Sequence, residues 1–97
     1  MLYLLCNTPY SVFRATSFKK AFKKLTSENQ NAILVVIEKL ANGQILEAKY
    51  KDHLLVGNFK GCRECHVKSD LLLVYRIKDE IMELALVETG SHSALFG

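Results

Sequence analysis

The chain has 97 residues, of which 49% are hydrophobic and 24% charged, and its formal net charge is +3. This length fits one small domain with a single core, and the balance of apolar and charged residues excludes a two-domain enzyme and a disordered tail. The apolar runs are much shorter than the roughly 18 residues that a membrane span needs, which excludes a multi-span membrane protein. We therefore expect one domain over residues 1–97, in which residues 1–9 are a short N-terminal extension.

The charges are unevenly distributed along the chain. Residues 1–78 carry all 13 Lys and Arg against six acidic residues, whereas residues 79–97 carry four acidic residues and no Lys or Arg. A basic body favours a polyanionic partner such as nucleic acid, because phosphate contacts release counterions. An ordinary solvated surface is the alternative, since a net charge of +3 is mild.

The N-terminus and the cysteines indicate the compartment. The first residues are apolar, but they lack a basic region and the apolar run ends at Asn7, so they do not resemble a signal peptide. Three cysteines, Cys6, Cys62 and Cys65, are an odd number and too few for a disulfide framework. Both features predict a reducing, cytoplasmic location.

The first predicted elements are one strand and one helix. Residues 10–15 are a candidate strand, and residues 17–25 predict an amphipathic helix because apolar side chains recur at intervals of three and four. Four lysines between positions 19 and 24 would cover the opposite face of this helix. They fit either a solvated surface or a contact for RNA.

A second helix is predicted to begin at Ser27. Residues 27–30 match a capping box, in which Ser27 at the N-cap and Gln30 three residues later satisfy each other's backbone amides. An apolar stripe follows over residues 33–41. Asn42 and Gly43 should end the helix, because both tolerate a left-handed conformation.

The second half of the chain is predicted to be mostly strand. Residues 44–60 form a connection, and strands are expected at residues 62–68, 71–78 and 81–88, separated by turn-forming residues. Short connections make neighbouring strands antiparallel. Two helices followed by a strand meander predict an α+β fold, with both N-terminal helices packed on one face of a twisted antiparallel sheet.

Residues 62–66 match Cys-x-x-Cys-His, the attachment pattern of c-type haem. Haem attachment needs both thiols on one side, whereas strand positions three apart face opposite ways. Zinc would draw a fourth ligand from His53 or His92, but structural zinc usually takes two paired clusters and this chain offers one. We therefore expect no metal and no cofactor, with Cys65 as a small core residue.

Alternation along residues 62–68 predicts one titratable face. Glu64, His66 and Lys68 share that face, while Cys65 belongs to the apolar face. Glu64 and His66 are two strand residues apart, about 7 Å, which suits an acid/base pair. An ordinary polar outer face is the alternative.

The register of the next strand extends this prediction. A three-residue turn at residues 69–71 would place Glu64 opposite Arg76 and His66 opposite Val74. We prefer this register because it separates polar from apolar side chains. It adds Arg76 to the titratable face.

These titratable residues suit the cleavage of RNA without a metal. That reaction needs a base for the 2′-hydroxyl proton, an acid for the leaving 5′-oxygen and a cation for the phosphate. Histidine can serve as acid or base near neutral pH. The candidates are His53, His66 and His92 with Glu64, Asp70, Lys68 and Arg76. Each histidine by itself also fits a surface or packing role, and Phe96 fits either a base-stacking role or the core.

Five short motifs, taken in chain order, carry a family resemblance. They are Tyr-Lys-Asp-His at 50–53, Leu-x-Gly-x-Phe-Lys-Gly at 55–61, Arg-Glu-x-His-Val at 63–67, Asp-Leu-Leu-Leu-Val-Tyr at 70–75 and Thr-Gly-Ser-His-Ser-Ala-Leu-Phe at 89–96. Together they resemble the YafQ branch of the RelE superfamily, over residues 10–97. The resemblance implies an α+β fold of the small microbial ribonuclease type.

The resemblance also implies an activity and partners. It implies the toxin of a type II toxin–antitoxin system, an endonuclease that cuts mRNA in the ribosomal A site without metal or cofactor. It implies a cognate antitoxin that binds and neutralises the toxin, and contact with DNA only through that complex.

Residue roles follow from the same resemblance. The positions that match functional positions of the family are His53, Glu64, His66, Asp70, His92 and Phe96. His53 would be the general base and His92 the general acid, while His66 and Asp70 would orient the phosphate region.

One departure matters, because many relatives have an arginine where this chain has Glu88. An anion there should repel the scissile phosphate, and Arg76 or Lys68 would have to compensate. A toxin-fold protein that binds its antitoxin or the ribosome but cleaves poorly is therefore the second hypothesis.

Overall fold

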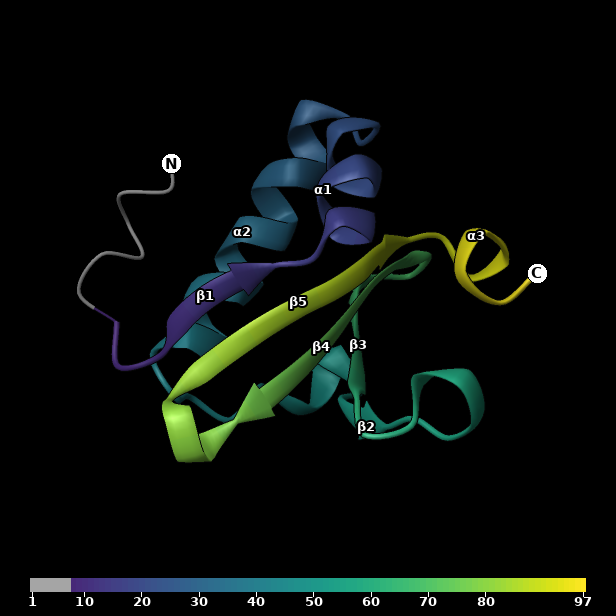
Figure 1. Ribbon diagram of the computed structural model, residues 1–97. Helices are drawn as coiled ribbons and strands as arrows, with labels where there is room; N and C mark the ends of the chain where they lie inside the picture. The colour runs from purple at the N-terminus through teal and green to yellow at the C-terminus, as the bar shows by residue number, and fades with distance from the viewer. Residues whose placement is uncertain (1–7) are drawn as a thin grey trace.

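Helices pack on a five-stranded sheet in the computed structural model, which describes residues 8–97 (Figure 1). The strands, in the spatial order β1-β5-β4-β3-β2, are β1 (Ser11–Arg14), β2 (His53–Leu54), β3 (Arg63–Lys68), β4 (Leu71–Lys78) and β5 (Glu83–Gly90). The helices are α1 (Thr16–Lys23), α2 (Ser27–Ala41) and α3 (His92–Phe96), with 3-10 turns at Ala48–Tyr50, Gly57–Phe59 and Asp79–Ile81. The predicted α+β class is confirmed. Of the expected N-terminal extension, residues 1–7 lie outside the described residues.

The sheet is mixed rather than wholly antiparallel. β1 pairs with β5 in parallel, from Ser11 opposite Glu83 to Arg14 opposite Leu86, while the other three strand pairs are antiparallel. The expectation of antiparallel neighbours rested on short connections. It did not apply to β1, because both helices and most of the sheet separate β1 from β5 along the chain, and a long crossover permits a parallel pair.

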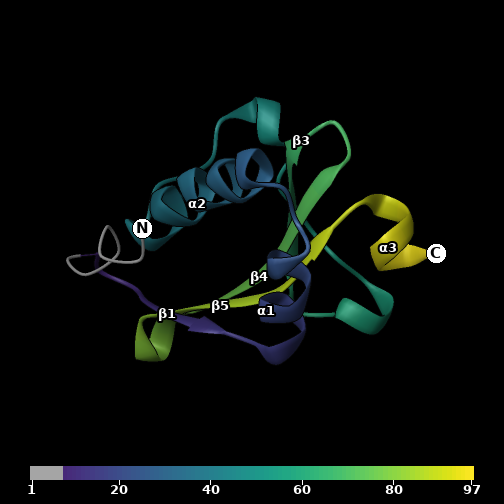
Figure 2. The ribbon, with the colours of Figure 1, turned by 90° about the horizontal axis from the view of Figure 1, so that it is seen from above.

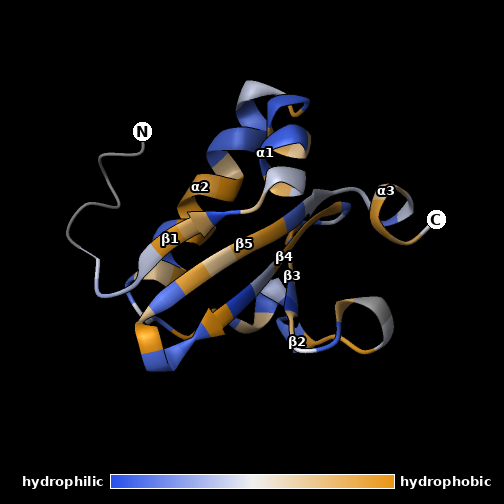
Figure 3. Ribbon diagram, in the orientation of Figure 1, coloured by the Kyte–Doolittle hydropathy of each residue, from blue (hydrophilic) through white to orange (hydrophobic). Residues whose placement is uncertain are grey.

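The core lies between α2 and the sheet. The apolar stripe of α2 is fully buried, and its members are Ile33, Val36, Ile37, Leu40 and Ala41. Cys65, Leu73 and Tyr75 meet this stripe from the sheet, and Phe18 of α1 joins them. Figure 3 shows the contrast between the apolar body of α2 and the hydrophilic surface of α1. Figure 2 shows α3 and the turn Gly57–Phe59 on the other side of the sheet from α2.

The N-cap of α2 is Thr26, one residue before the predicted Ser27. The Thr26 hydroxyl accepts a hydrogen bond from the backbone N–H of Asn29 at 3.2 Å. Gln30 does not complete a capping box, because its side-chain amide donates to the carbonyl of Phe22 at 2.9 Å. The predicted capping box is therefore wrong, and Gln30 instead ties the start of α2 to the end of α1.

We expect Thr26→Ala to lower the free energy of unfolding by about 1 kcal/mol, because an amide of the first turn of α2 loses its acceptor. Urea unfolding monitored by circular dichroism measures this change. Ser27→Ala is the matched control and should have little effect. Equal losses in both variants would contradict the assignment of the cap.

The turn between β3 and β4 differs from the prediction by its length. Lys68 pairs with Leu71 across a two-residue turn, and a bulge interrupts the ladder between His66 and Lys68. Glu64 consequently lies opposite Val74 rather than the predicted Arg76. The bulge compensates for the shorter turn, so Glu64 still faces away from the core that receives its neighbour Cys65.

The other strand and helix predictions agree with the structure within a few residues. The connection over residues 44–60 additionally contains the edge strand β2, and the last residues form α3, neither of which was predicted. Within residues 8–97, no helix combines the length and the hydropathy required to cross a bilayer.

Candidate active site

Two imidazoles meet one buried carboxylate at the edge of the sheet. β2 pairs His53 with Glu64 of β3, and His66 follows two residues later on the same strand. The Nε2 atoms of His53 and His66 lie 3.4 Å and 3.5 Å from the same Oε1 of Glu64, and the two ring centroids are 6.3 Å apart. The Glu64 side chain is 5% exposed, against 49% for His53. In this cluster the Glu64 carboxylate is buried, whereas the imidazole rings of His53 and His66 are accessible to solvent.

The backbone determines the tautomer of His53. Its Nδ1 lies 2.8 Å from the carbonyl oxygen of Lys51. A carbonyl can only accept a hydrogen bond, so Nδ1 carries a proton. In the neutral ring, Nε2 then keeps its lone pair, and this atom lies 3.4 Å from Oε1 of Glu64.

One oxygen of Glu64 is left without a partner. Its Oε2 is buried, and within residues 8–97 it accepts no hydrogen bond. A buried polar atom without a partner lowers the stability of the fold. Such groups are retained at functional sites, which is consistent with a role for Glu64 in chemistry rather than in packing.

Asp70 positions the helix that carries His92. From the β3–β4 turn, its carboxylate Oδ1 accepts a hydrogen bond from the backbone N–H of His92 at 3.0 Å. The Ser91 hydroxyl accepts from Ala94 N at 3.2 Å, so two side chains cap the start of α3. The Asp70 carboxylate thus contacts α3, whereas the resemblance implies a role for Asp70 in orienting the phosphate region.

The sheet brings α3 toward the histidine pair. Gly90 at the end of β5 lies opposite Leu72, which in turn lies opposite His66. Two strand spacings separate Gly90 from His66, about 10 Å. His92 therefore begins α3 immediately beyond the row of the sheet that contains His66.

Phe96 connects α3 with the turn that precedes β3. Its ring lies 5.8 Å from that of Phe59 in an edge-to-face contact and 5.2 Å from that of His92. Phe96 remains 42% exposed. The ring is therefore packed on one part and exposed on another, and it lies outside the hydrophobic core.

The two cations expected at the site lie at its margins. The Lys68 ammonium donates to Asn29 Oδ1 at 2.9 Å and lies 3.7 Å from Glu28. Lys68 also lines a groove of about 430 Å³ together with His66. Arg76 is exposed on the face that carries Glu64, and its guanidinium lies beside Gly61.

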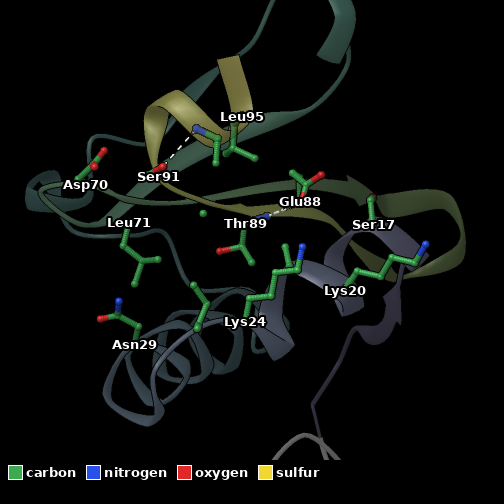
Figure 4. A pocket seen from close by; sticks show the side chains of 14 residues that line it. Ser17, Lys20, Lys24, Asn29, Asp70, Leu71, Glu88, Thr89, Ser91 and Leu95 are labelled. Carbon is green, nitrogen blue, oxygen red and sulfur yellow. Dashed lines mark hydrogen bonds between the residues drawn. The ribbon is translucent and has the colours of Figure 1, made fainter. Parts of the chain in front are cut away.

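Glu88 lines a second, larger pocket of about 600 Å³ between α1 and α3 (Figure 4). Its carboxylate accepts a hydrogen bond from its neighbour Thr89 N at 3.2 Å. Lys20 and Lys24 of α1 line the same pocket. The motifs did not predict that lysines of α1 would line the same pocket as Glu88. Only the packing of α1 along β5 brings them there.

The Cys-x-x-Cys-His segment contributes packing. Cys62 and Cys65 are free and buried. Burial, and after it the carboxylates of Asp52 and Glu64, raise the pKa of Cys65 to about 12, so its thiol is neutral at physiological pH. Within residues 8–97, no group of three or more metal-ligating side chains is arranged to hold a metal ion.

Comparisons with known proteins give the family of this chain. Residues 10–97 match the sequence profile of the family described as the bacterial toxin of type II toxin–antitoxin systems, YafQ. The mRNA interferase toxin YafQ of Escherichia coli K12 is 38% identical over 71 residues, which are 72% of this chain and 75% of that protein.

Solved structures of related toxins share the fold. A metal-bound toxin from Helicobacter pylori superposes with a TM-score of 0.80 at 44% identity, covering 90% of this chain and 99% of that one. The toxin in the E. coli DinJ–YafQ toxin–antitoxin complex gives a TM-score of 0.80 at 33% identity, covering 92% and 99%. The chain belongs to the YafQ family of toxins from type II toxin–antitoxin systems.

Proposed function

We propose that this protein is an endoribonuclease that cleaves mRNA on the ribosome and that a cognate antitoxin neutralises it. The observation that carries the proposal is the convergence of His53 and His66 on the buried carboxylate of Glu64, at distances of 3.4 Å and 3.5 Å. Two further findings on relatives support it. The E. coli relative is named an mRNA interferase, and an E. coli YafQ has been crystallised with an antitoxin.

The proposed reaction is an internal transfer at phosphorus. His53 takes the proton from the 2′-hydroxyl through Nε2, the oxygen attacks the phosphorus, and His92 gives a proton to the departing 5′-oxygen. The products are a 2′,3′-cyclic phosphate and a 5′-hydroxyl. The negative charge of Glu64 stabilises the imidazolium that forms on His53, because its Oε1 lies 3.4 Å from Nε2.

The other candidate residues surround this step. His66 contacts the same Glu64 carboxylate, and it lines the groove that also contains Lys68. Asp70 positions His92 through the backbone of α3. Arg76 and Lys68 supply positive charge for the phosphates, and the open part of Phe96 stacks on a base. We propose that this chemistry takes place in the cytoplasm, where translated mRNA is found.

The direct test is cleavage of mRNA on ribosomes by the purified protein. Primer extension should locate cuts in a message carried by ribosomes, and the products should have 2′,3′-cyclic phosphate and 5′-hydroxyl ends. Products with 5′-phosphate ends would exclude the acid/base reaction. Intact messages would reject the nuclease assignment, and purified antitoxin should protect the message.

A weakly catalytic binding module is the second candidate, and Glu88 is the observation that favours it. We expect Glu88→Arg to raise the cleavage rate about tenfold or more, because a cation replaces an anion beside the phosphate during charge development. Single-turnover cleavage on programmed ribosomes measures the change. Glu80→Arg, at an exposed residue of the β4–β5 turn, makes the same change in charge elsewhere and should have little effect. A rate that is unchanged in Glu88→Arg would contradict an unfavourable effect of Glu88 on cleavage.

A further inference from the structure

Asp52, the residue before His53, makes a second set of contacts. Its carboxylate accepts a hydrogen bond from the Tyr75 hydroxyl at 2.7 Å and lies 3.2 Å from Arg63 Nε. Tyr75 is 1% exposed, and the Asp52 side chain is 23% exposed. One carboxylate therefore joins the segment before β2 to β3 and to β4.

The protonation states favour this cluster at neutral pH. Burial, and after it the hydrogen bond to Asp52, raise the pKa of Tyr75 above its ordinary value, so the phenol keeps its proton and donates. Burial lowers the pKa of Arg63, but the Asp52 carboxylate outweighs that effect and the net pKa is raised. Asp52 thus accepts hydrogen bonds from a neutral donor and a charged donor.

β2 has little else to hold it in place. It is two residues long, and its pairing consists of His53 opposite Glu64 and Leu54 opposite Arg63. Both of its residues are exposed. A strand this short at a sheet edge gains few ladder hydrogen bonds and little burial, so its backbone alone positions its side chains weakly.

Because of strand alternation, these contacts lie on the two opposite faces of the sheet. Asp52 and His53 are consecutive, and so are their partners Arg63 and Glu64. Consecutive strand residues face opposite sides of a sheet. The pair of Asp52 and Arg63 therefore holds the segment on the side of Tyr75 and the core, while His53 meets Glu64 on the other side.

We propose that Asp52 is a positioning residue, which through Arg63 and Tyr75 holds His53 Nε2 within reach of Glu64. The inference rests on the proposed function, in which His53 takes the proton of the 2′-hydroxyl. Asp52 itself lies on the other side of β2 and does not touch the reacting atoms. Its role is to maintain the 3.4 Å contact between His53 and Glu64.

The first arm of the test measures geometry and needs no RNA. Asp52→Asn removes the charge that holds Arg63, and Tyr75→Phe removes one hydrogen bond while the buried ring is preserved. Imidazole chemical shifts in NMR spectra should move for His53 in both variants, and more in Asp52→Asn. The His66 signals should move less than those of His53, because β3 holds His66 and the two rings are connected only through the Glu64 carboxylate.

The second arm measures catalysis on programmed ribosomes. Asp52→Asn should lower kcat about 10- to 100-fold with little change in KM, as expected when a catalytic group is displaced by about 1 Å. Tyr75→Phe should show a smaller loss in the same direction. Glu47→Gln is the matched control, since it breaks a carboxylate–cation pair of 3.0 Å with Lys39 in the same connecting segment, and it should change neither kcat nor the His53 signals.

The two arms separate this inference from the nuclease assignment. Unmoved His53 signals in Asp52→Asn would overturn the positioning role, whatever the activity. If the His53 signals move in Asp52→Asn but kcat is unchanged, the position of His53 would not depend on Asp52 in a way that matters for catalysis, and that part of the inference would be overturned. If the wild type does not cleave mRNA, the proposed function fails, while the NMR arm still decides whether Asp52 positions His53. Should Asp52→Asn fail to fold, Tyr75→Phe gives the same decision.

Discussion

Replacing His92 by alanine is expected to reduce mRNA cleavage by about 10² to 10⁴-fold, the contribution of a positioned general acid. The 5′-oxygen would then leave without a proton donor, although the RNA could still bind. The fold should survive, because Asp70 contacts the backbone N–H of residue 92 rather than the imidazole. Single-turnover cleavage on ribosomes that carry a message measures the loss.

The control for His92 is Ser93→Ala, on the same short helix. Ser93 is exposed, so its replacement should leave the cleavage rate within about twofold of the wild type. In cells, His92→Ala should also relieve growth arrest. Arrest that persists without cleavage would favour the binding module, and unchanged cleavage would remove His92 from the mechanism.

Replacing Glu64 by glutamine is expected to separate activity from stability. The variant loses the charge that faces both imidazoles, so cleavage should fall about 100-fold or more. Stability should not fall with it, since the variant removes a buried charge whose Oε2 has no partner within residues 8–97. The free energy of unfolding should stay constant or rise by about 1 kcal/mol.

The measurements for Glu64→Gln are urea unfolding and single-turnover cleavage. Glu83→Gln is the matched control, because Glu83 is a partly covered strand carboxylate paired with Lys78 at 3.5 Å. It should leave cleavage unchanged. A large loss of stability in Glu64→Gln would show that the carboxylate is a structural group, and wild-type cleavage would exclude it from the site.

Local patterns predicted most of the elements correctly, because those signals lie within a few neighbouring residues. The stripe of α2 repeats with the helical period, and the alternation of β3 separates Glu64 and His66 from Cys65. The N-cap was predicted one residue too late, because two neighbouring residues are both suited to cap α2. Both Thr26 and Ser27 can cap a helix, and the contact of Gln30 with the end of α1 lies outside the reach of a four-residue motif.

The fold class, the polar face of β3 and, through the ordered motifs, the family could all be predicted from the amino-acid sequence. Three contacts became known only from the folded chain. His53 lies next to Glu64, Lys20 and Lys24 share a pocket with Glu88, and Tyr75 donates a hydrogen bond to Asp52. The difference lies in the range of the interactions along the chain. Periodicity and alternation are set by neighbouring residues, whereas these contacts join segments 11 to 68 positions apart and depend on strand register, a bulge and the packing of α1.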